Sequence, residues 1–179
     1  QFSGLKLDHL LFIGSNRVAK KVAAQAAKNL VPTTLELGGK SPTIIGTNAN
    51  MALAAERILF SKTLNAGQIC LSPDYIFVKK DEEKNLISEL QKAYSKFFPE
   101  PNSHNQTSMV NKHHLKRMNS YLLDATKKGA KVESLGKNDD LNRNMLSTKI
   151  VTEVNDGMDV MKHEIFGPVL PIMTYDTIS

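Results

Sequence analysis

The stretch Leu10-Leu11-Phe12-Ile13-Gly14-Ser15 contains an apolar run of strand length followed by a turn. Residues 17–29 after it are rich in Ala, Lys and Gln, which are strong helix formers, and Pro32 ends that pattern. The run of β-branched and apolar residues at 33–37 then has the character of a second strand. This order of strand, turn, helix and strand predicts an α/β fold.

The same alternation continues through the rest of the chain. Further strands are expected at residues 42–45, 75–78, 131–134, 150–154 and 169–174. Helices are expected at residues 51–64 with Asn50 as N-cap, from the N-cap Asp81 to residue 97, and at 108–128 before Gly129. Loops are expected at 99–106 and 136–144. We therefore predict an open, largely parallel twisted sheet flanked by helices, in a single domain over residues 1–179.

The composition is that of an ordinary globular protein, with 41% hydrophobic and 23% charged residues among 179. No apolar run approaches the roughly 18 residues needed to cross a bilayer, so we expect no membrane partner. The formal charge is +5, but the lysines are spread over several predicted helices and mixed with acids. This pattern favours solvated helix faces over a nucleic-acid surface. The single cysteine excludes an internal disulfide and fits a cytoplasmic protein.

The segment Asn65-Ala66-Gly67-Gln68-Ile69-Cys70 contains that cysteine. A nucleophilic thiol needs access and a backbone that lets a substrate come close, and Gly67 permits a tight turn after the preceding helix. A lone cysteine is more commonly buried and structural. Taken alone, the segment therefore leaves both interpretations open.

The segment Leu35-Glu36-Leu37-Gly38-Gly39-Lys40-Ser41-Pro42 places a carboxylate between two leucines at the end of a predicted strand. Glu36 is a candidate general base if it is partly buried, and the two glycines would let a ligand approach the backbone. The alternative is an exposed glutamate on an edge strand, followed by a plain turn. The segment also resembles the end of a phosphate-binding loop, but Thr34 stands where that motif needs a glycine, which excludes it.

Two further segments have the character of ligand-binding turns. Gly14 and Ser15 would offer the amides of a helix N-terminus to a phosphate, although no G-x-G-x-x-G fingerprint occurs. The segment Glu164-Ile165-Phe166-Gly167-Pro168 combines an acid, an aromatic ring and a rigid turn before a strand, and its alternative is a hydrophobic loop anchor. No spacing of His and Cys residues suits a metal, so we expect none.

The order and spacing of these segments together resemble the aldehyde dehydrogenase superfamily. The resemblance is carried by residues 12–15, 35–42, 65–70 and 164–168, and it covers essentially the whole chain. Residues 71–75 and 8–12 look most like the coniferyl aldehyde dehydrogenase branch. Two positions depart from the family pattern: Ala19 stands where a second glycine is usual, and Ile13 replaces a threonine.

The resemblance implies catalytic roles for two residues. Cys70 would attack an aldehyde to give a thiohemiacetal and then a thioester, and Glu36 would activate the water that hydrolyses it. The product would be a carboxylic acid, and the substrate an aldehyde of aromatic, coniferyl type.

The resemblance also implies NAD or NADP as cofactor. Glu164 would bind the ribose next to the nicotinamide, with Phe166 near the ring. Gly14, Ser15 and Leu37 would be further cofactor-binding residues. The full-length enzyme would be a homodimer.

The sequence begins at Gln1 rather than Met and stops just after a strand-like run, so we expect a fragment of a longer enzyme. The family's dinucleotide-binding domain would lie mostly upstream, together with an asparagine that completes the oxyanion hole. We therefore expect the isolated chain to be inactive. Two alternatives stay open: a non-enzymatic remnant or assembly module of the same fold, and a cofactor-free thiol acyl transferase or hydrolase.

Overall fold

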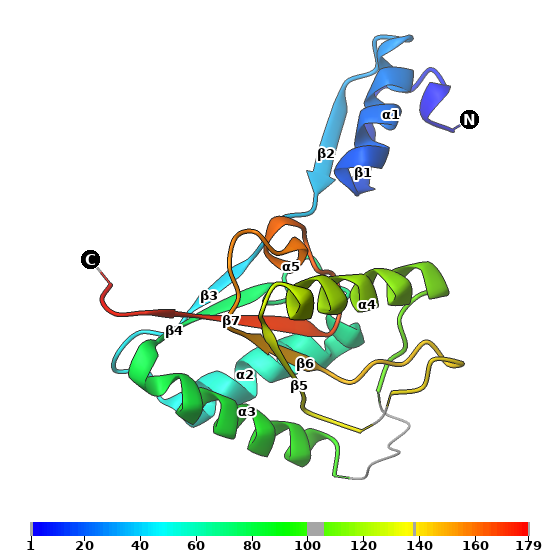
Figure 1. Cartoon of the computed structure of the whole chain (residues 1–179). Helices are drawn as coiled ribbons and strands as arrows, with labels where there is room; N and C mark the ends of the chain where they lie inside the picture. Colours follow the sequence, from blue (N-terminus) through cyan, green and yellow to red (C-terminus); the bar gives the residue numbers. More distant parts are fainter. Residues whose placement is uncertain (1, 100–105, 138, 179) are drawn as a thin grey trace. The chain divides into compact units, whose positions relative to one another are not determined.

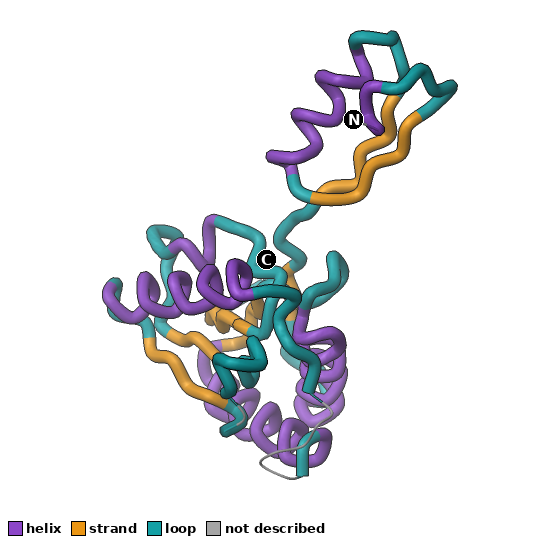
Figure 2. The backbone as a smooth tube through the Cα atoms, turned by 90° about the vertical axis from the view of Figure 1, so that its right-hand side faces the viewer, coloured by secondary structure: helices purple, strands orange, loops and turns teal. Residues whose placement is uncertain are grey.

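The computed structural model describes residues 2–99, 106–137 and 139–178, and it divides the chain into two compact units, residues 1–39 and 40–179. The first unit is a β-α-β arrangement after a short 3₁₀ turn, η1 (Phe2–Gly4) (Figure 2). Strands β1 (Leu10–Gly14) and β2 (Thr33–Leu37) pair in parallel. Helix α1 (Asn16–Ala27) connects them and packs its inner face on Leu10 and Val31.

Local chemistry explains both ends of α1. Ser15 is the N-cap, and its Oγ accepts a hydrogen bond from the backbone N–H of Val18 at 3.4 Å. The helix ends at Ala27, two residues earlier than the sequence predicted. The reason is a turn in which Leu30 has a φ of 56° and the Val31 N–H donates to the Ala26 carbonyl.

Within its described residues, the second unit forms a five-stranded sheet with the strand order β3-β4-β7-β6-β5 (Figure 1). These strands are β3 (Pro42–Ile44), β4 (Tyr75–Lys79), β5 (Lys131–Ser134), β6 (Lys149–Thr152) and β7 (Val169–Tyr175). Neighbours from β3 to β6 pair in parallel, and only the edge strand β5 is antiparallel. The predicted open, largely parallel sheet is therefore confirmed.

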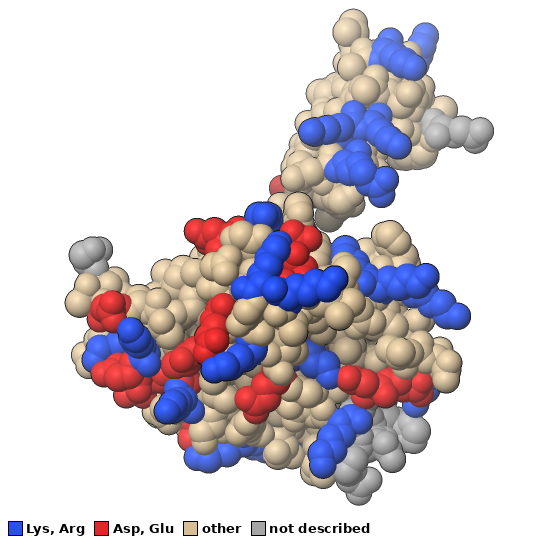
Figure 3. Space-filling view, viewed as in Figure 1, with Lys and Arg blue, Asp and Glu red and all other residues tan. Residues whose placement is uncertain are grey.

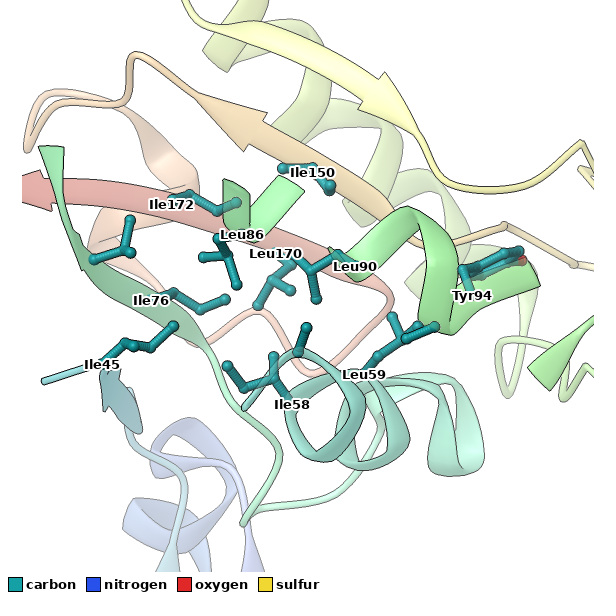
Figure 4. Packing of buried hydrophobic residues seen from close by; sticks show 13 residues of the cluster. Ile45, Ile58, Leu59, Ile76, Leu86, Leu90, Tyr94, Ile150, Leu170 and Ile172 are labelled. Atoms are coloured by element: carbon teal, nitrogen blue, oxygen red, sulfur yellow. The ribbon is translucent and has the colours of Figure 1, made fainter. Parts of the chain in front are cut away.

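Helices cover both faces of this sheet. Helices α2 (Met51–Thr63) and α3 (Glu83–Phe97) pack on one face, where Ile76, Leu86 and Leu170 are fully buried (Figure 4). Helix α4 (Lys112–Lys127) and the short α5 (Asp159–Lys162) belong to the core of the other face. Adjacent residues of β6 and β7 alternate between the two cores, as the pleat of a strand requires.

Two helix starts differ from the prediction. Asp81 is not an N-cap: it lies in a 3₁₀ turn, η3 (Lys80–Glu82), and pairs with Lys79 at 2.7 Å. Helix α4 begins at Lys112 rather than near residue 108, because Asn111 caps it through a bond from the His114 N–H at 3.0 Å. The residues before Asn111 are held by bonds to other segments rather than by a helical turn.

Some predictions about organisation stay predictions. Residues 100–105 of the expected loop at 99–106, and residue 138 of the loop at 136–144, lie outside the described residues. A single domain over residues 1–179 also stays a prediction, because each of the two units is compact by itself.

The surface of the second unit carries both signs of charge. On the face drawn in Figure 3, basic and acidic side chains are interspersed over this unit. In the part of the chain that the structure describes, no helix has the length and apolar character needed to span a membrane.

Candidate active site

Sheet topology brings three of the sequence segments to one edge. Strands β3, β4 and β7 are consecutive parallel neighbours, so their amino ends lie at the same edge of the sheet. The chain enters β3 just after Lys40, enters β4 after Cys70, and enters β7 after the segment 164–168. The segment containing the cysteine and the segment 164–168 therefore lie at the same end of the sheet although they are far apart in the sequence.

The turn before Cys70 has an unusual backbone. Helix α2 leads into a 3₁₀ turn, η2 (Leu64–Gly67), in which Asn65, Ala66 and Gly67 have φ values of 50°, 55° and 71°. Three consecutive left-handed residues reverse the chain after the helix, which confirms the tight turn expected at Gly67. Cys70 follows with an exposed side chain. A buried structural cysteine, the alternative left open by the sequence, is therefore wrong.

The backbones of the two segments are in contact at Gly67. A Cβ at this position would lie 2.5 Å from the Gly167 carbonyl oxygen and 3.1 Å from that of Lys62. Gly167 is itself enclosed on another side by the Met118 side chain. A side chain at position 67 would prevent this approach, so Gly67 lets the turn before the cysteine pack directly on the segment 164–168.

A buried carboxylate joins the three entering segments. Asp74 is 4% exposed, and its Oδ1 accepts a hydrogen bond from the Ile165 N–H at 2.8 Å. Its Oδ2 pairs with Lys40 Nζ, which also donates to the carbonyls of Val160 and His163, each at 3.0 Å. The lysine of the Gly-Gly-Lys segment thus has a structural role, and the sequence analysis missed its partner Asp74.

Arg117 on α4 fixes the backbone of the segment 164–168. Its Nη1 donates to the Glu164 carbonyl at 3.0 Å and its Nη2 to the Phe166 carbonyl at 3.5 Å. Phe166 has a φ of 46°, which these bonds help to hold. Nη2 also lies 3.3 Å from His114 Nδ1. Arginine has no acceptor, so this ring nitrogen must accept the bond.

The environment of His114 suits that role. Burial lowers its pKa, and the charges of Arg117 and His113 lower it further, so the neutral ring is favoured.

The sequence analysis found no function for the histidines and did not identify Arg117. No motif signals this contact, because the bonds join residues 47 and 49 positions apart.

Lys62 is the most deeply buried charged side chain of this region, with 1% exposure. Its Nζ donates to the Pro73 carbonyl at 2.9 Å, beside the cysteine segment. Burial lowers its pKa from 10.5 to about 7; Asp74 opposes this shift and Lys40 adds to it. Its position in helix α2 gave no indication of this burial.

The remaining predicted residues lie in the other unit. Glu36 is the penultimate residue of β2 and is exposed, so the described residues do not supply the partial burial expected of a general base. Leu37 is the last residue of β2 and is 39% exposed. Gly14 ends β1, and Ser15 caps α1, so both lie between strand and helix as expected. In the second unit, the side chains of Glu164 and Phe166 are half-buried.

The first turn of α1 is chemically suited to an anion. It contains no acidic residue, and its second residue is Arg17. A helix start without a negative side chain and with a basic residue nearby favours a phosphate group. Among the described residues, no group of three or more His, Cys, Asp or Glu side chains is arranged to hold a metal ion.

The fold is that of a known family. Residues 4–179 match the model of the aldehyde dehydrogenase family, and the chain belongs to that family. It is 44% identical to a probable coniferyl aldehyde dehydrogenase of Caulobacter vibrioides, covering 99% of this chain and 38% of the relative. It is 41% identical to a coniferyl aldehyde dehydrogenase of a Pseudomonas species, covering 97% of this chain and 37% of that protein. The predicted resemblance is thus confirmed.

Solved structures agree. The chain superposes on AldH of Staphylococcus aureus in its substrate-bound state with a TM-score of 0.90 and 37% identity, covering 98% of this chain and 38% of that one. A betaine aldehyde dehydrogenase of the same organism, in complex with NAD+, gives a TM-score of 0.83 at 26% identity. This match covers 98% of this chain and 36% of that one. The chain therefore spans less than two fifths of the length of these relatives.

The close approach at Gly67 predicts that adding a methyl group at this position lowers the free energy of unfolding more than at other glycines with a positive φ. Gly67→Ala should destabilise the fold by roughly 3 kcal/mol or more, because a strained φ and a backbone clash add together. Gly129→Ala is the matched control, since Gly129 has a φ of 99° but open space around its Cβ position, and should cost about 1–2 kcal/mol. Urea unfolding measures both. Equal losses in the two variants would show that the contact with Gly167 is not tight.

The burial of Lys62 predicts a pH dependence of stability. Between about pH 7 and pH 10.5 the unfolded chain holds a proton at this lysine that the folded chain has lost, so the free energy of unfolding should rise with pH. Lys62→Met should remove this part of the rise, whereas Lys84→Met, at an exposed lysine, should keep it. Urea unfolding from pH 7 to pH 10 tests the difference. The same slope in wild type and Lys62→Met would contradict a lowered pKa.

Proposed function

We propose that the protein containing this chain oxidises an aldehyde to the carboxylic acid with NAD+ or NADP+, and that residues 1–179 are its catalytic part. The observation that carries the proposal is the exposed Cys70, which follows a left-handed turn packed against the segment 164–168. A strained turn that presents an accessible thiol is typical of a nucleophile rather than of a core residue. Membership of the aldehyde dehydrogenase family supports the same conclusion.

Cys70 acts first in the proposed reaction. Its Sγ attacks the carbonyl carbon of the aldehyde and forms a thiohemiacetal, while negative charge develops on the carbonyl oxygen. The backbone N–H of Cys70 donates a hydrogen bond to that oxygen. NAD(P)+, when bound, supplies the oxidant for this carbon. Cys70 then carries the acyl group as a thioester.

Glu36 acts second, as the general base. Its carboxylate takes a proton from a water molecule, which attacks the thioester carbon and expels the Cys70 thiolate. The carboxylic acid leaves, and the thiol is restored. The support for this role is the position of Glu36 as the penultimate residue of β2, two residues before the Gly38-Gly39 turn of the segment that resembles the family's glutamate motif.

The residues proposed to hold the cofactor have different tasks. The amides at the start of α1, after Gly14 and Ser15, suit the negative pyrophosphate. Leu37 would contact the cofactor from the end of β2. Glu164 would accept bonds from ribose hydroxyls, and Phe166 would pack beside the nicotinamide ring. The bonds from Arg117 to the carbonyls of Glu164 and Phe166 support this arrangement by fixing their backbone.

The substrate and setting are also proposals. The named relatives favour a coniferyl-type aromatic aldehyde. NAD+ is the cofactor in the complex of the betaine aldehyde dehydrogenase, which favours a nicotinamide dinucleotide without separating NAD+ from NADP+. We propose a cytoplasmic homodimer for the complete protein, with no nucleic-acid or membrane partner. The isolated chain should turn over aldehyde poorly.

Replacing the nucleophile tests the activity. In the complete protein, coniferyl aldehyde should drive formation of NADH or NADPH, followed by absorbance, and Cys70→Ala should lower the rate by roughly 10⁴-fold or more. Leu123→Ala, at an exposed position of α4, is the control and should leave the rate unchanged. A panel of aldehydes with both cofactors identifies the substrate. Undiminished turnover by Cys70→Ala would refute the nucleophile, and no turnover with any aldehyde would favour the non-enzymatic alternative.

Replacing the base tests the second step. Glu36→Gln should slow thioester hydrolysis, so one equivalent of reduced cofactor should form quickly before a slow steady state. Intact-protein mass spectrometry should then find the acyl group on Cys70. Asp8→Asn removes another exposed carboxylate of the same unit and should behave like wild type. If neither variant accumulated the acyl group, Glu36 would not be the base.

A further inference from the structure

The side chain of Gln68 is buried at 9% exposure beside the left-handed turn that precedes Cys70. Its Nε2 donates to the Asn65 carbonyl at 2.9 Å and to the Ser108 carbonyl at 3.2 Å. Its Oε1 accepts from the Val110 N–H at 2.9 Å. Two carbonyls accept from the amide nitrogen and an N–H donates to the amide oxygen. A flipped amide would place oxygen against oxygen, so only this orientation satisfies the three bonds.

Two hydrogen bonds between Asn65 and Gln68, one donated by each residue, hold the turn itself. The backbone N–H of Gln68 donates to the Asn65 carbonyl at 3.1 Å, and Asn65 Nδ2 donates to the Gln68 carbonyl at 3.1 Å. The Gln68 side chain adds the only described bonds that extend from this turn to residues 108–110. Those residues lie just before α4, and the Met109 N–H is held in turn by the Asn144 carbonyl.

This closure matters because the turn is strained. A non-glycine residue held in the left-handed region costs on the order of 1–3 kcal/mol, and Ala66 is such a residue with a buried side chain. A strained backbone persists only where its surroundings fix it more than once. Without the Gln68 amide, the chain between α2 and β4 can relax toward ordinary backbone angles, and Cys70 lies two residues further along.

We infer that Gln68 is a positioning residue for the nucleophile: its amide fixes the turn that aims the thiol and the backbone N–H of Cys70 at the aldehyde. This inference rests on the proposed function and deepens it. Gln68 does not touch the reacting atoms; it acts through the backbone of the turn. The segment 108–110 thereby becomes part of the active-site support.

Gln68→Glu is the sharpest test, because it keeps the shape and replaces the donor. At neutral pH a carboxylate has no hydrogen to give to the carbonyls of Asn65 and Ser108, and it repels both oxygens. When the pH falls and the carboxyl is protonated, one donor returns. The defect should therefore lessen as the medium becomes more acidic, whereas a destabilising core substitution that adds no titratable group, such as Leu86→Ala, should show no such pH dependence.

The primary readout is the rate at which iodoacetamide alkylates Cys70 in the complete protein, compared with wild type at each pH from 5.5 to 8.5. At pH 8 we expect Gln68→Glu to react at a clearly different rate from wild type, with the ratio returning toward one at pH 5.5. The rate constant kcat for aldehyde oxidation should fall by about 10²-fold at pH 8, because a misplaced reacting group costs a factor of this size. The KM for the cofactor should change little.

Three further variants are controls. Gln68→Asn keeps a shorter amide and should retain more activity than Gln68→Met, which has no donor. Leu86→Ala destabilises the core of the α2 and α3 face without touching the turn, and should leave the alkylation rate at wild-type values while the protein is folded. A pH-independent defect in Gln68→Glu, or the same alkylation rate as wild type at every pH, would overturn the inference.

The two proposals fail separately. Alkylation of Cys70 needs neither aldehyde nor cofactor, so its pH dependence tests Gln68 even if the protein oxidises no aldehyde. A pH-dependent alkylation defect without any aldehyde turnover in wild type would refute the proposed activity and keep Gln68 as the residue that fixes the Cys70 turn. Normal turnover in wild type, with no alkylation defect in Gln68→Glu, would support the proposed activity and refute the positioning role of Gln68.

Discussion

The carboxylate of Asp74 joins the three segments that enter β3, β4 and β7. It accepts the Ile165 N–H and pairs with Lys40, whose ammonium reaches two further carbonyls. The Asp74 carboxylate is buried whereas the Lys40 side chain is partly exposed, and removing the cation from a buried carboxylate typically destabilises a protein by roughly 3–5 kcal/mol. Because the three segments come from distant parts of the sequence, this pair fixes their relative positions at one edge of the sheet.

Close backbone packing at Gly67 and hydrogen bonds to main-chain atoms further fix the segments that the ion pair joins. Gly67 lets the turn before Cys70 contact the Gly167 carbonyl, and Arg117 holds the carbonyls of Glu164 and Phe166. Gln68 fixes the turn from the side of residues 108–110. Most of these bonds involve main-chain atoms. The arrangement therefore depends on the geometry of the backbone more than on exposed side chains, and the side chain of Cys70 stays exposed.

Much of the fold could be predicted from periodicity. The strands from β1 to β7 were predicted to within one or two residues of their bounds. A short apolar run bounded by turn residues is too short for a helix and has the length of a buried strand. The clearest errors fell at helix starts: Asp81 pairs with its near neighbour Lys79 in a 3₁₀ turn, and the backbone N–H groups of Met109 and Val110 donate to Asn144 and Gln68 instead of starting a helix. Helix α1 also ended two residues early. The burial of Lys62 was also missed, since lysine is rarely enclosed and its helix shows no sign of it.

The sequence by itself determined the family, the α/β class and the segments containing Cys70, Glu36 and Glu164, because those depend on residue types in a fixed order. Only the tertiary structure decided that Cys70 is exposed after a strained turn and that Asp74, Lys40 and Gln68 support it. The physical reason is distance along the chain. A hydrogen bond between residues tens of positions apart leaves no local pattern, whereas parallel strands place their amino ends side by side and make such bonds possible.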